Sequence, residues 1–283
     1  MAAVRRTSLL FVLSLMSLSV PLAQASASYT SIDYPGAIAT YVYGMNNRGE
    51  IVGQYSDSGG QSHGFLLSNQ VFTSLDVPGG TLTGALGIND SGLVVGYFSS
   101  AAGIQGFLWD GQSFTTIAPP GATFTMANGI NNSGEIVGFY RASDFNRRGF
   151  RFGSNGYVTI APPRVQDSEL TGINDAGDVV GFYTDIFGLN RGFRDHNGHF
   201  DHINYPGAMD TAAWGVNDHG VIVGQFRNHD GSTNSFAVRG HAYVSVEFPG
   251  GQSTIVLDVN DAGLMVGYYF DSGSLAHGFL RTP

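Results

Sequence analysis

The chain has 283 residues, with 22 acidic against 13 basic side chains and a formal net charge of −9. This negative excess repels nucleic-acid phosphates and anionic lipid headgroups, so we expect no nucleic acid and no membrane as partner. The chain contains no cysteine, which excludes disulfides and thiolate chemistry. Its 41 glycines and 42% hydrophobic residues indicate a globular protein with many tight turns.

Residues 1–25 are predicted to be a signal peptide. Arg5 and Arg6 provide a positively charged start, residues 9–20 form an apolar stretch, and Ala23-Gln24-Ala25 fits a signal-peptidase site. The apolar stretch is shorter than the roughly 20 residues that span a bilayer. We therefore expect cleavage near Ala25, release from the membrane, and a secreted or periplasmic protein.

Residues 26–283 form six copies of one unit of about 43 residues. Each copy has four short apolar runs separated by turn residues, which is typical of antiparallel β-strands. In the second copy these runs end in Gly-Ile-Asn (87–89), Val-Val-Gly-Tyr-Phe (94–98), Gly-Phe-Leu-Trp (106–109) and Phe-Thr-Thr-Ile (114–117). No window has the apolar spacing of a helix, so we predict almost no helix.

The two ends of the chain predict a closed ring. The repeats begin with a run of the fourth type at 29–34 and end with one of the third type at 278–281. Four strands in about 43 residues match a propeller blade. Pairing the first run with the last three closes the ring and removes exposed sheet edges. We predict an all-β fold, a six-bladed β-propeller of four-stranded antiparallel blades. The alternative, an open solenoid, would need capping repeats that neither terminal unit resembles.

The repeat, seen most fully from Gly87 to Trp109, resembles the bacterial extracellular repeat of the HAF family. The resemblance covers the whole of residues 26–283. This chain departs from the tripeptide that names the family, since it has His-Gly-Phe at 63–65 and 277–279. The resemblance implies export and a propeller-like array of β-repeats. It implies no settled activity and carries over no catalytic residues.

Differences between the six copies indicate candidate ligand contacts. The predicted hairpin turns are short and uniform, whereas the loops on the opposite face are longer and more varied, and we place the function there. One variable column enters the first strand: Tyr41, Gly84, Met126, Glu169, Ala212 and Ile255. A second follows two residues later: Tyr43, Leu86, Asn128, Thr171, Trp214 and Leu257. A third, at the start of the third strand, is polar in every copy: His63, Gln105, Arg148, Arg191, Asn234 and His277. The ligand-binding candidates are this third column together with Tyr41, Glu169 and Trp214.

Charges in the third and fourth copies allow two interpretations. Glu169 is the only acid in its column, and arginines gather around the third strands of these copies. A carboxylate that faces several guanidinium groups can clamp an anionic or hydroxyl-rich ligand. In the simpler interpretation the charges pair locally on the blade surface. The polar third column likewise has a simpler interpretation, as a strand end near solvent.

No motif predicts a metal, a cofactor or a catalytic site. His196, His199 and His202 flank a hairpin, where alternate side chains point in opposite directions. Single aspartates in the loops, such as Asp57, are too few for calcium and are interpreted as turn caps. The sequence has no nucleophile elbow, phosphate-binding loop or zinc-protease motif. We therefore expect no metal and no cofactor.

The sequence favours a secreted, monomeric, non-enzymatic binding module whose ligand is a carbohydrate or a protein. Sixfold repetition without a catalytic motif supports this interpretation. One alternative is a hydrolase or lyase that acts on polysaccharide, with unassigned catalytic residues at the axial opening. A second alternative is a structural component of the cell envelope.

Overall fold

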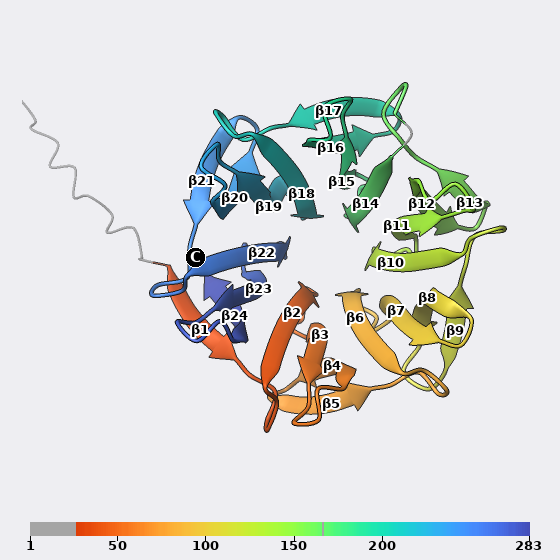
Figure 1. Cartoon of the computed structure of the whole chain (residues 1–283), viewed down its shortest axis with the longest axis vertical. Coiled ribbons are helices and arrows are strands. Elements are labelled where there is room, and N and C mark those ends of the chain that lie inside the picture. Colours follow the sequence, from red (N-terminus) through yellow and green to blue (C-terminus); the bar gives the residue numbers. More distant parts are fainter. Residues whose placement is uncertain (1–26, 166) are drawn as a thin grey trace, which may run out of the picture.

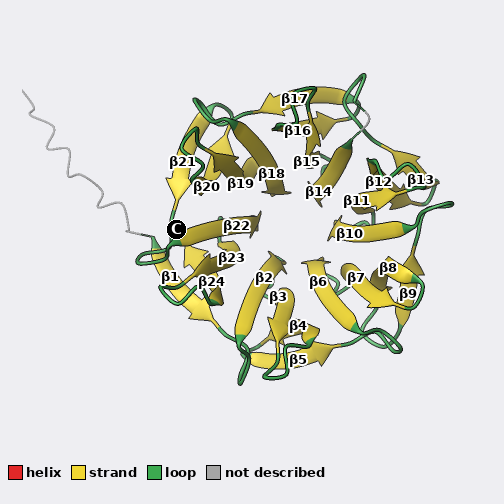
Figure 2. Ribbon diagram, viewed as in Figure 1, coloured by secondary structure: helices red, strands yellow, loops and turns green. Residues whose placement is uncertain are grey.

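The computed structural model describes residues 27–165 and 167–283. The predicted signal peptide, residues 1–25, lies outside the described residues. Six four-stranded antiparallel sheets are arranged as a ring around a central axis (Figure 1). The described residues form strands and loops and contain no helix, which confirms that prediction (Figure 2). Accordingly, no helix within these residues is long and apolar enough to cross a membrane.

The strands follow the same order in every blade, with the first strand on the axis and the fourth at the rim (Figure 1). Blade 1 contains β2 (Ala39–Met45), β3 (Ile51–Ser56), β4 (Ser62–Ser68) and β5 (Val71–Leu75). Blade 2 contains β6 (Leu82–Ile88), β7 (Val94–Ser100), β8 (Gly103–Trp109) and β9 (Phe114–Ile117). Blade 3 contains β10 (Phe124–Ile130), β11 (Ile136–Arg141), β12 (Arg147–Gly153) and β13 (Gly156–Thr159). Blade 4 contains β14 (Ser168–Ile173), β15 (Val179–Thr184), β16 (Asn190–His196) and β17 (His199–Ile203). Blade 5 contains β18 (Asp210–Val216), β19 (Val221–Arg227), β20 (Thr233–Arg239) and β21 (Ala242–Val246). Blade 6 contains β22 (Ser253–Val259), β23 (Met265–Phe270), β24 (Ala276–Thr282) and, at its rim, β1 (Ser28–Ile32).

Blade 6 is closed by strands from both ends of the chain, as the sequence predicts. β1 pairs antiparallel with β24, from Ser28 opposite Thr282 to Ile32 opposite Gly278. The hydroxyl oxygens of Ser28 and Thr282 are 2.6 Å apart. This pairing covers the outer edge of β24, which would otherwise present unpaired backbone groups. The six-bladed fold and its mode of closure are therefore confirmed.

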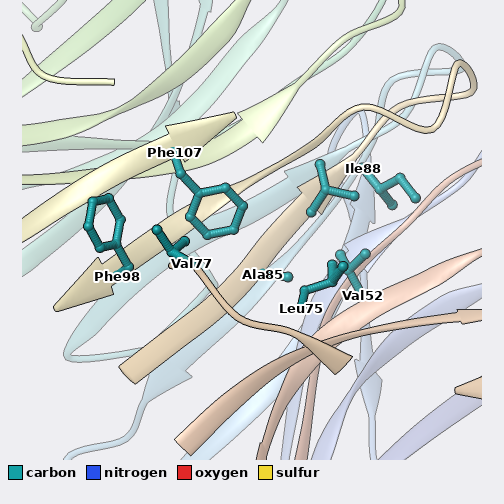
Figure 3. Packing of buried hydrophobic residues seen from close by; sticks show 8 residues of the cluster. Val52, Leu75, Val77, Ala85, Ile88, Phe98 and Phe107 are labelled. Carbon is teal, nitrogen blue, oxygen red and sulfur yellow. The ribbon is translucent and has the colours of Figure 1, made fainter. Parts of the chain in front are cut away.

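The hydrophobic core lies between adjacent blades. Each third strand has one fully buried phenylalanine, such as Phe107, which follows a glycine in five blades and Ser235 in blade 5. Between blades 1 and 2, Val52 and Leu75 from blade 1 meet Ile88, Phe98 and Phe107 from blade 2 (Figure 3). Burying large side chains of this kind stabilises a fold by about 1.5–3 kcal/mol each. Because each blade shares its core with its neighbours, the ring is stable only as a whole.

Stacked aromatic rings also link neighbouring blades on the outer side of this core. Tyr34, which follows the rim strand of blade 6, stacks on Tyr55 of blade 1 with ring centroids 3.6 Å apart. Two further junctions have the same arrangement, Tyr205 on Phe226 at 3.6 Å and Phe248 on Tyr269 at 3.7 Å. The proline loops therefore tie each of these rim strands to the following blade.

The two faces of the ring differ in their loops. We call hairpin face the end that carries the turns between first and second strands, such as residues 46–50 in blade 1. We call loop face the opposite end, which carries the proline loops and the turns between second and third strands, such as residues 57–61. Asp57 accepts hydrogen bonds from the backbone amides of Gly59 and Gln61, and Asp185 and Asp271 do the same in blades 4 and 6. The loop aspartates are turn caps, as predicted.

Two rings of hydrogen bonds close the hairpin face around the axis. In the first ring, one asparagine from each blade occupies the same position of the repeat. Its Nδ2 donates a hydrogen bond to the backbone carbonyl of the equivalent asparagine in the next blade, at 2.9–3.3 Å. Its members are Asn46, Asn89, Asn131, Asn174, Asn217 and Asn260. In the second, each backbone amide donates to the side chain of the next blade at 2.7–2.9 Å. Its members are Asn47, Asp90, Asn132, Asp175, Asp218 and Asp261.

Candidate functional site

A β-bulge in the first strand of every blade directs one side chain toward the axis. In blade 1 the register shifts between Val42 and Gly44, which leaves Tyr43 without a partner on β3. The same shift occurs in all six blades. Bulges re-aim side chains in this way. The bulged residues are those of the second variable column: Tyr43, Leu86, Asn128, Thr171, Trp214 and Leu257.

The residue that follows each bulge brings the first strands close together. In five blades it is glycine, and a Cβ atom added at Gly44 would lie 2.6 Å from the carbonyl oxygen of Leu86 in the next blade. Blade 6 has Asp258 at this position. Its Oδ2 accepts a hydrogen bond from the backbone amide of Met45 at 3.0 Å, across the junction between blades 6 and 1. The axis is therefore narrow at this level and carries a single carboxyl group.

A cavity of about 250 Å³ lies on the axis toward the loop face. Its wall combines aromatic rings, aliphatic side chains and a few polar groups: Tyr43, Leu86, Tyr97, Met126, Asn128, Glu169, Thr171, Trp214, Gln225, Ile255, Leu257 and Tyr268. Of the ligand-binding candidates from the sequence, Glu169 and Trp214 line it. Tyr41 stands beside it, with its ring 5.0 Å from that of Tyr268 and 6.3 Å from that of Tyr43.

Part of this wall comes from a column that the sequence analysis did not select. It lies on the second strand directly after the glycine of the Val-Gly pair, and Tyr97, Gln225 and Tyr268 belong to it. Tyr97 donates to Gln54 of the preceding blade at 2.9 Å, and the Nε1 of Trp214 donates to Gln225 at 3.2 Å. The sequence feature that could have identified this column is its mixture of amide and aromatic residues: Gln54, Tyr97, Phe139, Phe182, Gln225 and Tyr268.

Among the described residues, Glu169 is the only charged one that lines this cavity, and its hydrogen bonds are long. Its side chain accepts from Asn128 Nδ2 and from Arg147, both at 3.4 Å. Glu169 is only 9% exposed. Burial raises the pKa of its carboxyl group to about 7, while the charge of Arg147 opposes that rise. The carboxyl group is thus buried against the cavity with unused hydrogen-bonding capacity.

The arginines of blades 3 and 4 do not converge on Glu169. Arg147 alone reaches it, and its shorter contacts are with Asp167 at 2.6 Å and Thr184 at 2.9 Å. Arg148 pairs with Asp144 and Arg191 with Asp185. The multi-arginine clamp considered from the sequence is therefore not formed, because each guanidinium group is held by a nearby carboxylate. Local pairing is the observed arrangement.

The third variable column lies away from the axis, on the third strands at the loop face. His63 contacts Asp76 at 2.9 Å and Asp57 at 3.5 Å, and His277 contacts Asp33 at 2.8 Å and Asp271 at 3.6 Å. Arg148 and Arg191 pair with loop aspartates as described above. The two remaining members, Gln105 and Asn234, are neutral. The six residues do not converge on one site, and their role as ligand contacts stays a prediction.

A second, smaller cavity of about 110 Å³ lies on the axis toward the hairpin face. Both hydrogen-bonded rings and Asp258 line it. Burial raises the pKa of Asp258 to about 7 and also raises the pKa of Asp218, whose neighbours Asp261 and Asp175 add to that rise. The pKa of Asp90 is lowered, because hydrogen bonds from Asn132 and Asn47 outweigh its burial. Among the described residues no group of histidines and acids could hold a metal ion.

Several solved structures share this architecture. AofleA from Arthrobotrys oligospora matches with a TM-score of 0.58 and 12% identity, over 90% of this chain and 86% of that one. The Aleuria aurantia lectin, a six-bladed β-propeller that recognises fucose, matches with a TM-score of 0.52 and 10% identity, over 86% and 91%. The SapL1 lectin, solved with α-methyl fucoside, matches with a TM-score of 0.51 and 12% identity, over 84% and 90%.

The chain is a six-bladed β-propeller. At these identities the likeness shows the fold alone. No protein-family model matches the sequence, and no curated protein matches it either. The resemblance to the HAF family therefore stays a prediction.

Proposed function

We propose that this protein is an exported carbohydrate-binding propeller that holds a saccharide unit in the axial cavity at the loop face. The observation that carries this proposal is the composition of the cavity wall. Aromatic rings give the apolar faces of a sugar a surface to pack on, and a few polar groups fix its hydroxyls, a combination typical of small-molecule sites. The lectin propellers with the same fold are consistent with it.

Polar groups on the cavity wall remain available for a ligand. Within the described part of the chain, the hydroxyl groups of Tyr43 and Tyr268 have no hydrogen-bond partner, and Glu169 has only two long ones. Tyr43 and Tyr268 are half-buried, and open polar groups on the wall of an otherwise apolar cavity favour a polar ligand. Hydrolysis is less well supported, because a glycosidase needs two carboxyl groups, and within residues 27–165 and 167–283 only Glu169 places one on this wall.

Intrinsic fluorescence can report occupancy of this cavity directly. The chain has two tryptophans, and Trp109→Phe leaves Trp214 in the cavity wall as the single reporter. We expect a panel of oligosaccharides to contain members that change Trp214 emission in a saturable manner. No response to any saccharide would contradict the proposal, and release of reducing ends from a polysaccharide would favour the enzyme alternative.

A matched pair of glutamines locates the site. Gln225→Ala removes an amide from the cavity wall, and we expect affinity to fall about tenfold, since a polar ligand loses one hydrogen bond and packing. Gln105→Ala removes the same side chain from the third variable column and should leave affinity unchanged. The opposite result would move the binding site to the third column.

Export is tested separately from binding. When the full-length chain is expressed in a bacterium, we expect the protein outside the cytoplasm to begin near Ser26. An intact N-terminus on cytoplasmic protein would contradict the signal-peptide prediction and would leave the binding proposal standing.

A further inference from the structure

The charge along the axis has one sign. Glu169 lines the loop-face cavity, and five carboxyl groups line the hairpin-face cavity: Asp90, Asp175, Asp218, Asp258 and Asp261. Among the described residues no arginine or histidine lines either cavity, and the chain has no lysine. Clefts lined by one sign of charge concentrate ligands of the opposite sign. The axis therefore attracts cations.

Aromatic rings line the loop-face cavity together with this carboxyl group. Tyr43, Tyr97, Trp214 and Tyr268 lie on the same wall as Glu169 and come from blades 1, 2, 5 and 6. The negative faces of such rings attract ammonium groups, and several rings around one cavity are a known arrangement for binding them. No single blade carries this set, so only the closed ring assembles it.

The two nearest arginines do not satisfy Glu169. Arg147 directs its shortest contact to Asp167 at 2.6 Å and only a long one to Glu169 at 3.4 Å. Arg141 lies over the ring of Phe124, 5.4 Å from its centroid, and is absent from the cavity wall. A buried carboxylate held this weakly is costly unless a ligand supplies a partner.

We propose that the axial cavity selects saccharides that carry a free ammonium group, with Glu169 as the counter-ion and the surrounding aromatic rings as the cage. This inference rests on the proposed carbohydrate-binding function and names the chemical class of its ligand. An N-acetylated sugar lacks the positive charge of the ammonium group, and a uronic acid carries a negative charge instead.

Proton uptake and release provide a second signature. The charged groups that face Glu169 are Arg147 on β12 and Arg141 on β11, and the neutral Asn128 faces it from β10. Burial raises the pKa of Glu169 to about 7, and the positive charge of a bound ammonium group would lower that pKa. Binding near pH 7 should thus release roughly half a proton from Glu169.

The test uses the Trp109→Phe protein with Trp214 as reporter and four probes. They are a glucosamine trimer, an N-acetylglucosamine trimer, a galacturonic acid trimer and choline. We expect the glucosamine trimer to bind about tenfold more tightly than the acetylated trimer, and the galacturonic acid trimer to bind weakest. Glu169→Gln should abolish the difference between the first two. Glu247→Gln, which removes an exposed glutamate far from the axis, should preserve it.

The outcomes separate this inference from the function on which it rests. If the acetylated trimer binds as well as glucosamine, or if Glu169→Gln keeps the preference, the ammonium inference is wrong and saccharide binding stands. If choline alone binds, the cage is confirmed and saccharide binding is wrong. If no probe alters Trp214 emission, the ammonium inference is wrong, and the oligosaccharide panel decides saccharide binding separately. Calorimetry in buffers of different ionisation enthalpy compares proton release by the parent protein with that by Glu169→Gln, because proton uptake by the sugar amine is common to both. Equal proton release in the two proteins contradicts the role of Glu169.

Discussion

Buried carboxyl groups near the axis make the free energy of unfolding depend on pH. Burial raises the pKa of Asp258 and of Glu169 to about 7, whereas an unfolded chain has values near 4. Between these values the folded protein binds more protons than the unfolded chain. The stabilisation from each group is therefore fully present below pH 4 and is lost as pH rises through 7.

We predict that Asp258→Asn flattens this dependence. Between pH 5 and pH 8 the free energy of unfolding of the parent protein should fall by about 2 kcal/mol or more, because the buried carboxyl groups of Asp258 and Glu169 must both ionise in the folded state. The variant should lose about half of that fall, although it also loses one acceptor for the amides of Met45 and Val259. Urea denaturation at the two pH values measures the difference.

Asp110→Asn is the matched control. This aspartate is exposed in the turn between β8 and β9, and backbone hydrogen bonds from Ser113 and Gln112 lower its pKa. It is ionised in both folded and unfolded protein between pH 5 and pH 8, so its removal should leave the pH dependence unchanged. An Asp258→Asn protein with the same slope as the parent would show that the axial carboxyl group is not perturbed.

At the scale of the element, the hairpin between first and second strands has two roles. The Oδ1 of Asn89 accepts hydrogen bonds from the amides of Ser91 and Leu93 at 3.0 Å each, which shapes its own turn. Its Nδ2 donates to the carbonyl of Asn131 in the next blade. One side chain thus folds a hairpin and links it to its neighbour. The first role is typical of asparagine in a tight turn, whereas the second exists only between neighbouring blades.

Asn89→Asp separates these roles. The aspartate keeps the acceptor for its own turn but removes the donor and places a charge beside the carbonyl of Asn131. We expect the free energy of unfolding to fall by about 3 kcal/mol at pH 7, measured by urea denaturation. Asn69→Asp, in an exposed turn between β4 and β5, should change it by less than about 0.5 kcal/mol. Equal effects at both positions would contradict a structural role for the asparagine ring.

At the scale of the whole molecule, ring closure depends on β1, a strand of five residues from the N-terminal end. β1 supplies five paired residues and buries Ile32 against blade 1. Without it, β24 would become an exposed edge, and such edges pair with other chains.

We predict that a chain of residues 33–283 is less stable and self-associates. Its free energy of unfolding should fall by about 3 kcal/mol or more relative to residues 26–283, because it loses the burial of Ile32 and a row of backbone hydrogen bonds. Light scattering coupled to size-exclusion chromatography should show larger species that grow with concentration. A monomer of unchanged stability would mean that β1 is dispensable for closure.

The sequence by itself determined the architecture of this protein. A unit of about 43 residues, four runs per unit and a spare fourth-type run at the start are local patterns, and sixfold repetition reinforces each of them. They predicted the blades, the strand order and the pairing of β1 with β24. The sequence also brought Glu169 and Trp214 into the set of candidate residues, since both stand out within their columns.

Only the tertiary structure decided what surrounds the axis. The bulge that turns Tyr43 and Trp214 inward depends on the pairing of two strands. The cavity wall that contains Tyr97, Gln225 and Tyr268 combines residues from all six blades. Only the folded positions show that the arginines of blades 3 and 4 pair with nearby carboxylates and that Arg147 alone makes a long contact with Glu169. A cavity built from single residues in many repeats leaves no contiguous motif, because its geometry exists only once the ring is closed.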